Sequence, residues 1–294
     1  MKNNSVRYIP RRKFLEMSMK GGLLIATAPS VLYALNSCSG SGATFPPPGI
    51  DPSLLSKVLA RALEKGGDFA DIYVESRISR QIVMEESIFR GGLYGVSQGA
   101  GIRVVSGNKT GYAYTEELTK DKLLRAADIA SFVARGGDKA SVKPVSVTER
   151  PSYVTVKITL QQVADEQRLQ ILKRADEAAR DYDRRIKMTS IEYNDEIRSR
   201  IIATSEGVYL QDELPLLFFI VQAMSDDGFS RHMARERLSY HSGFEMFESV
   251  TPETVARNAA REAVDMLGAK DAPAGIMDVV MQNGWGGVLV HEAV

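Results

Sequence analysis

His291 and Glu292, adjacent near the end of the printed chain, are the two residues whose types and spacing could do chemistry. In helical zinc peptidases a histidine ligand precedes a glutamate that acts on the metal-bound water, and a second histidine follows along the helix. Zinc lowers the pKa of that water to about 7, so a neighbouring carboxylate can accept its proton. The pair is therefore a candidate metal ligand and general base, although such a dipeptide also occurs by chance and a lone histidine is more often structural.

The segment that must position this pair predicts a strand, a turn and an apolar element, in that order. Residues 277–281 are expected to form a strand, and the glycine-rich run 283–287 a tight turn, with close approach of a peptide to the backbone as the alternative. A strongly apolar segment begins at Val288 and is still in progress at Val294. We therefore expect the chain to be truncated at its C-terminal end.

Hydrophobic periodicity and capping residues upstream predict an α+β fold. Helices are expected over 51–65, 120–135, 161–182 and 252–267. Strands are expected over 70–76, 81–89, 101–106, 109–114, 187–193, 198–203, 208–211 and 216–224. A polar stretch with Pro144 and Pro151 indicates a boundary. The sequence thus predicts a first module over 51–137, a second over 138–270, and the start of a C-terminal domain at 271–294.

The first 38 residues resemble a targeting signal and not part of a fold. Arg11 and Arg12 begin Arg-Arg-Lys-Phe-Leu, which matches the twin-arginine core, and a modest apolar stretch over 21–35 follows. That stretch is too short to span a bilayer, which needs roughly 20 apolar residues. This order predicts a Tat signal and export; the alternative is an ordinary basic N-terminus with a chance arginine pair.

Cys38, the single cysteine, ends the run Leu-Asn-Ser-Cys, which resembles a lipobox. Cys38 is thus a candidate lipidation site, with a lone cysteine near an ordinary cleavage site as the alternative. Residues 39–50 are rich in Ser, Gly and Pro and indicate a tether. Together these features predict a periplasmic protein or a lipoprotein attached to a membrane through a lipid anchor. One cysteine also excludes an internal disulfide and a C-x-x-C zinc or redox site.

The composition is that of an ordinary globular protein and disfavours nucleic acid as a partner. Hydrophobic residues make up 44% of the chain and charged residues 25%, which is enough apolar content for a packed core. The formal net charge is zero, but without the basic leader over 1–37 the body holds 31 basic and 36 acidic residues. A mildly acidic body offers no attraction for phosphate backbones.

The last twelve residues, 283–294, resemble the signature of TldD/PmbA metallopeptidases, whose pattern continues to a second histidine as H-E-x-x-x-H. Other blocks of that family are matched in order at residues 67–75, 101–104, 110–115, 205–207 and 273–275. The resemblance therefore covers about residues 51–294. It implies that His291 is the first zinc ligand and Glu292 the general base. It places the second histidine just past Val294 and a cysteine ligand later still, which Cys38 cannot replace, so this fragment would be inactive.

By the same resemblance, the expected substrates are peptides or unfolded polypeptides outside the cytoplasm. The family's catalytic subunits work with a PmbA/TldE-like partner that lacks the motif, and the His–Glu pair puts this chain on the catalytic side; a homodimer is the other arrangement. The alternative function is a non-catalytic peptide-binding or assembly subunit. Modulation of DNA gyrase, also attached to this family, is disfavoured by the predicted export and the acidic body.

Overall fold

The computed structural model describes residues 50–133, 140–147, 155–281 and 283–293. The predicted Tat residues Arg11 and Arg12 and the candidate lipidation site Cys38 lie outside the described residues. Most of the predicted tether lies outside them too, and its last residue, Ile50, is buried in the fold. Within the described part of the chain, no helix combines the length and the apolar character needed to cross a membrane.

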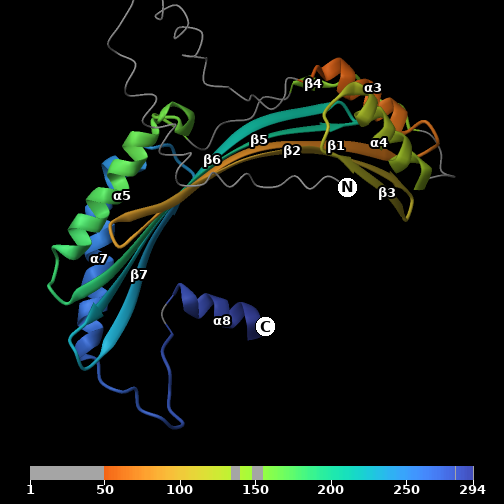
Figure 1. Ribbon diagram of the computed structural model, residues 1–294. Helices are drawn as coiled ribbons and strands as arrows, with labels where there is room; N and C mark the ends of the chain where they lie inside the picture. Colours follow the sequence, from red (N-terminus) through yellow and green to blue (C-terminus); the bar gives the residue numbers. More distant parts are fainter. Residues whose placement is uncertain (1–49, 134–139, 148–154, 282, 294) are drawn as a thin grey trace, which may run out of the picture.

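A seven-stranded sheet forms the centre of the molecule, with the strand order β3-β2-β1-β5-β6-β4 and with β7 also paired to β6. All neighbours are antiparallel except β4 and β6. Figure 1 shows the long strands bending into an arch. The strands are β1 Phe69–Glu85, β2 Ile88–Ser106, β3 Lys109–Thr115, β4 Ser146–Val147, β5 Ile186–Thr204, β6 Val208–Asp226 and β7 Arg231–Tyr240.

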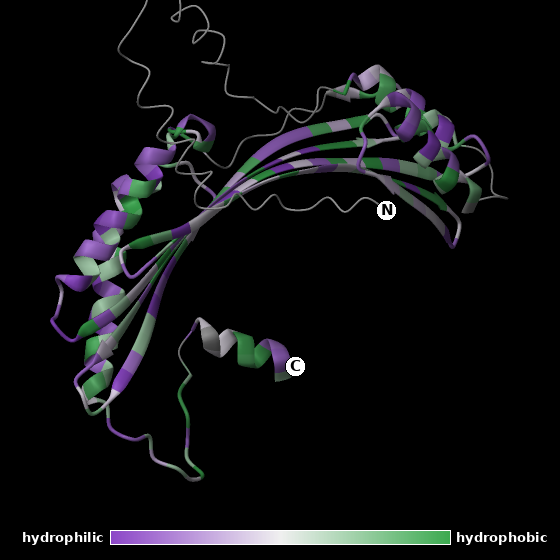
Figure 2. Ribbon diagram, in the orientation of Figure 1, coloured by the Kyte–Doolittle hydropathy of each residue, from purple (hydrophilic) through white to green (hydrophobic). Residues whose placement is uncertain are grey.

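Four main helices lie on the outer side of the arch, in two pairs (Figure 1). The first pair is α3 (Pro52–Ala62) and α4 (Lys120–Val133), and the second is α5 (Asp165–Arg180) and α7 (Pro252–Asp265). Figure 2 shows hydrophilic and hydrophobic segments along each, as expected for helices with one buried side. The shorter elements are η1 Leu160–Gln162, α6 Met246–Ser249, η2 Met266–Gly268 and α8 Trp285–Ala293.

The α+β fold class and the four main helices are confirmed, and capping explains where two of the helices begin. The Asp51 side chain accepts a hydrogen bond from the backbone N–H of Ser53 at 2.8 Å, and Pro52 follows as the first helical residue. Thr251 caps α7 in the same way, accepting from the N–H of Thr254 at 3.3 Å. A proline at this position loses nothing, because its missing N–H would have no partner inside the helix.

The strands are longer than the sequence predicted. The strands expected over 70–76 and 81–89 are one strand, β1, followed by the start of β2. Polar residues at 77, 79 and 80 broke the expected pattern, yet β1 continues through them because both of its neighbours pair with it there. The backbone ladder, and not side-chain hydrophobicity, decides the extent of this strand.

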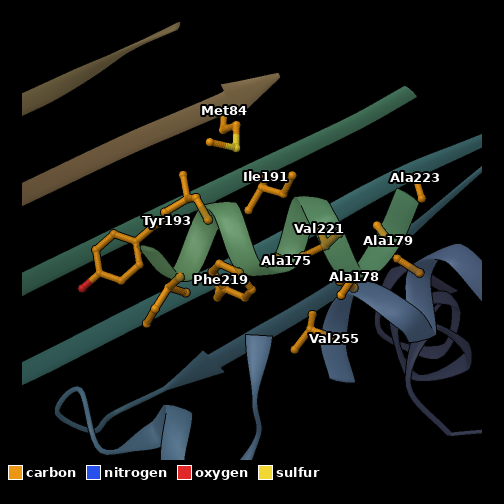
Figure 3. Close-up of a cluster of buried hydrophobic side chains, with 14 of the residues drawn as sticks. Met84, Ala175, Ala178, Ala179, Ile191, Tyr193, Phe219, Val221, Ala223 and Val255 are labelled. Carbon is orange, nitrogen blue, oxygen red and sulfur yellow. The ribbon is translucent and has the colours of Figure 1, made fainter. Parts of the chain in front are cut away.

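Two hydrophobic clusters pack on this one sheet, one under each helix pair. The cluster under α5 and α7 pairs large strand residues such as Tyr193 and Phe219 with helix alanines, of which Figure 3 shows Ala175, Ala178 and Ala179. Small helix residues let the helices approach the sheet closely. The cluster under α3 and α4 also receives residues of β5 and β6, so both clusters share strands. The predicted module limits stay a prediction.

A buried ion pair joins α5 to the sheet. The Arg168 guanidinium donates from Nε to Asp195 Oδ2 at 2.9 Å, and both side chains are fully buried. The Tyr193 hydroxyl donates to the same carboxylate oxygen at 2.9 Å, and the other guanidinium nitrogens donate to the carbonyls of Val163 and Leu160, both at 2.6 Å. Every partner that a buried carboxylate and guanidinium need is therefore present.

This pairing also sets the ionisation of the groups. Burial alone would lower the pKa of the Arg168 guanidinium, but the facing Asp195 carboxylate and Tyr193 raise it above its ordinary value. Burial, together with the neighbouring Asp195 carboxylate, raises the pKa of the Tyr193 hydroxyl. The raised pKa values keep the arginine charged and the tyrosine protonated.

Candidate metal-binding helix

The segment before α8 has no regular structure, so the strand predicted over 277–281 is wrong. Its apolar side chains point into solvent; Val280, for example, is 99% exposed. A strand needs a neighbour to take up its backbone hydrogen bonds, and no described strand pairs with these residues. A short, mostly apolar run was therefore not a sufficient signal for a strand.

A turn at Gly284 starts α8. Gly284 has a φ of 91°, a left-handed conformation that glycine adopts without strain, and its carbonyl accepts from the N–H of Gly287 at 2.9 Å. The predicted glycine-rich turn over 283–287 is thus only partly a turn, since the helix already begins at Trp285. A Cβ atom added at Gly287 would meet no other atom within 4 Å, so the fold itself does not require glycine there.

His291 and Glu292 occupy consecutive positions in the last turn of α8, which places their side chains about 100° apart around the helix. Both are exposed, as are the apolar residues Val288, Leu289 and Val290. In the view of Figure 1, α8 lies on the inner side of the arch, away from the four main helices. The pair is therefore exposed to solvent on a short apolar helix.

The donor types of this pair suit zinc, but their number does not complete a site. An imidazole nitrogen and a carboxylate oxygen are both ordinary zinc ligands, and a catalytic site uses three protein ligands. Among the described residues, no three His, Cys, Asp or Glu side chains gather closely enough to hold a metal ion. The described part of the chain supplies one portion of such a site.

The remaining histidines lie elsewhere. His232 is half-buried in β7, and His241 follows that strand with its Nδ1 3.2 Å from the carbonyl oxygen of Pro215. Both sit at the surface, and neither lies near α8 in sequence or in a described contact. They offer no additional ligand to His291.

Sequence reasoning missed the buried ion pair of Arg168 and Asp195. A signal was present: along β5 the odd-numbered residues face the helices, and Asp195 is a charged residue at one of these inward positions. A charge at a core position requires a buried partner. The sequence could not name Arg168 as that partner, because the choice depends on how α5 packs on the sheet.

Comparison with known proteins decides the family. The family model described as PmbA/TldA metallopeptidase domain 1 matches residues 70–134, and the one described as PmbA/TldA metallopeptidase central domain matches residues 158–267. The chain belongs to the TldD/PmbA metallopeptidase family. The two matches cover most strands and helices of the arch, from β1 to α7, but not α3 or β4.

Curated TldD/PmbA relatives agree with this assignment. A metalloprotease TldD homolog of Haemophilus influenzae is 28% identical over 234 residues, which cover 77% of this chain and 48% of the relative. A metalloprotease TldD homolog of Buchnera aphidicola is 27% identical over 236 residues, with the same coverage. The chain therefore spans about half the length of the curated relatives it matches.

Solved structures of the family share the fold. A protein of Thermotoga maritima, described as a proposed modulator of a DNA gyrase, superposes with a TM-score of 0.62 at 19% identity, covering 76% of this chain and 50% of its own. TldE of Thermococcus kodakarensis gives a TM-score of 0.57 at 15% identity, covering 71% and 47%. At these identities the similarity shows the fold alone.

Proposed function

We propose that this chain is the N-terminal part of a zinc-dependent TldD/PmbA-type metallopeptidase that hydrolyses peptides or unfolded polypeptides. His291 would be one metal ligand and Glu292 the general base. The observation that supports this most is their placement on consecutive positions of an exposed helix, in a chain whose upstream residues match the two family models. Curated relatives at 27–28% identity are themselves named metalloproteases.

The two side chains have separate roles in this proposal. A bound zinc ion would supply a water of lowered pKa. The His291 imidazole would hold the metal through one ring nitrogen, and the Glu292 carboxylate would accept the proton of the water. Exposure of both side chains on α8 leaves room for further ligands and for substrate. Since one histidine does not make a site, we propose that the remaining ligands come from sequence beyond Val294 and that residues 1–294 alone are inactive.

Metal content tests the assignment of His291. In a chain that includes the sequence downstream of Val294, we expect about one zinc per chain, and His291→Asn should reduce it to a small fraction because a three-ligand site loses a ligand. Atomic emission on purified, dialysed protein gives the ratio. His232→Asn, at a surface histidine on β7, is the matched control and should keep its zinc. Equal zinc in the His291→Asn chain and its parent would exclude His291 as a ligand.

The proposed location is outside the cytoplasm, reached through the Tat signal at Arg11 and Arg12, with Cys38 acylated. This rests on the residue pattern of the leader. Growth with radiolabelled palmitate should label the parent protein, and Cys38→Ala should remove the label. Label that persists without the cysteine would rule out the anchor.

The proposed partner is a PmbA/TldE-type subunit, with a homodimer as the other arrangement. The structural similarity to TldE of Thermococcus kodakarensis is compatible with either, because it shows that this fold is shared within the family. The alternative function, a non-catalytic peptide-binding or assembly subunit, would replace the peptidase if the chain bound its partner but no zinc. The relation to a proposed gyrase modulator rests on a shared fold at 19% identity and adds no gyrase function.

A further inference from the structure

Three methionines lie side by side on the sheet, at the end of the arch that carries α5 and α7 (Figure 1). Met188 of β5 pairs with Met224 of β6, and Met224 pairs with Met233 of β7. Their neighbours in the chain, such as Ala223 and Ala234, belong to the core under α5 and α7, so the three methionines point to the other, inner side of the sheet. Facing residues of adjacent strands are about 5 Å apart at Cα, so the three side chains form a continuous row.

The two outer side chains of this row are open to solvent. Met188 is 47% exposed and Met233 is 56% exposed, whereas Met224 between them is 7% exposed. The Met233 sulfur contacts Gln222 Nε2 of β6, so this side chain leans toward the strand that carries Met224. A methionine that fills a core is buried, so packing does not explain the two outer side chains, whose sulfur atoms are accessible acceptors.

A hollow of about 900 Å³ opens beside the row, and Met188 and Met224 are part of its wall. Six of its nine lining residues are charged: Arg184, Arg185, Lys187, Asp226, Asp227 and Arg231. An apolar protein surface docked on the methionines would have to bury these charges, which is costly. A small ligand that reaches the sulfur atoms leaves the charges in water, so the hollow favours an ion over a hydrophobic partner.

The carboxylates of the hollow are already engaged within the protein. Asp226 accepts hydrogen bonds from Arg231 Nη2 at 2.7 Å and from the N–H of Gly228 at 2.8 Å. Asp227 accepts from the N–H of Ser230 at 2.8 Å, within the turn between β6 and β7. The four basic residues of the wall outnumber these two acids, so a divalent cation is repelled more strongly than a monovalent one. The uncommitted donors of the row are therefore neutral thioether sulfurs.

We infer that Met188, Met224 and Met233 bind a Cu(I) ion through their sulfur atoms. Thioether sulfur is a soft ligand that selects Cu(I), whereas calcium and magnesium take oxygen ligands and zinc takes His, Cys or carboxylates. Each outer methionine is one strand spacing, about 4.8 Å, from the middle one, and its three rotatable side-chain bonds let the sulfur turn inward. The inference does not depend on the proposed zinc site, which uses different residues.

Copper binding by the full chain, loaded with zinc, tests the inference. Zinc keeps its own ligands occupied, and a Cys38→Ala background removes the thiol of the leader, which is itself a soft ligand. The protein is titrated with Cu(I) without oxygen, in competition with the coloured Cu(I)–bicinchoninate complex. We expect about one Cu(I) per chain, and X-ray absorption at the copper edge should show a first shell of sulfur alone.

Leucine substitutions remove the sulfur atoms one at a time. Met224→Leu should weaken Cu(I) binding at least about tenfold, because it removes the central ligand, while this swap of similar volume costs little stability. Met188→Leu and Met233→Leu, at half-exposed positions, make the same test if Met224→Leu does not fold, and far-ultraviolet circular dichroism checks each variant. The matched control is Met266→Leu, at a 42% exposed methionine of η2 outside the row, which should bind copper like the parent.

Four results would overturn the inference. They are no transfer of Cu(I) from bicinchoninate to the parent, equal affinity when all three methionines are leucine, nitrogen or oxygen in the first shell of copper, and loss of copper on His291→Asn with the methionines intact. The last result would place copper in the zinc site. Failure here with zinc retained would leave the proposed function standing, and failure of the zinc measurement with copper held by the methionines would leave this site.

Discussion

Glu292→Gln should lower kcat for peptide hydrolysis by about a thousandfold, in a chain that includes the sequence after Val294, while zinc content stays the same. Glutamine keeps the size and polarity of the side chain but cannot accept a proton. Because Glu292 is exposed on α8 and buried in no core, the substitution should leave the fold unchanged. Initial rates on a quenched fluorescent peptide, with zinc measured on the same sample, give both quantities.

A matched control for this substitution is Glu262→Gln, at an exposed glutamate of α7. It should retain full activity. Unchanged hydrolysis by Glu292→Gln would discard this residue as the base. Loss of zinc together with activity would make Glu292 a metal ligand and would reassign the role of the carboxylate.

Asp195→Ala should lower the free energy of unfolding by about 4 kcal/mol. The substitution removes the buried charged partner of the Arg168 guanidinium, leaving only the exposed Asp165 carboxylate, and removes the acceptor of the Tyr193 hydroxyl. It should be among the most destabilising single changes in the molecule, because a buried charge that loses its buried partner costs far more than a lost surface contact. Urea denaturation followed by circular dichroism measures the change.

The matched control is Asp212→Ala, which breaks an ion pair with Arg200 at the surface of the same sheet, where Asp212 is 46% exposed. Its effect should stay within about 1 kcal/mol, since exposed pairs are screened by solvent. The double change Asp195→Leu with Arg168→Met should recover most of the stability that Asp195→Ala loses. Equal destabilisation by Asp195→Ala and Asp212→Ala would show that the buried pair has no special weight.

Helices were predicted more accurately than strands, for a physical reason. A helix such as α7 has signals within its own sequence: Thr251 is its N-cap, Pro252 is its first residue, and alanines at helical spacing form its buried side. A strand such as β1 depends on partners more than a hundred residues away, and its polar middle gives no local sign that the ladder continues. Local rules therefore located the helices within a few residues, but they predicted each long strand as shorter separate strands.

The candidate site was predicted only as far as residues near in sequence could show it. His291 and Glu292 were placed together because they are adjacent, and the apolar element expected there is the helix α8. The preceding strand over 277–281 was wrong because its apolar residues have no partner to pack against among the described residues. The difference in length between β3, of seven residues, and its neighbour β2, of nineteen, also had no local signal in the sequence.

Because β1 pairs with β5, the core under α3 and α4 cannot be completed until the ribosome has synthesised β5. The backbone N–H of Ala70 donates to Ser205 Oγ at 3.0 Å across 135 residues, and Ile201 and Ala203 complete the cluster under α3 and α4. At typical rates of synthesis those residues emerge on the order of ten seconds after β1. During that interval a nascent chain holds an unsatisfied strand and an open apolar surface, so a chaperone that covers both should raise the yield of folded protein.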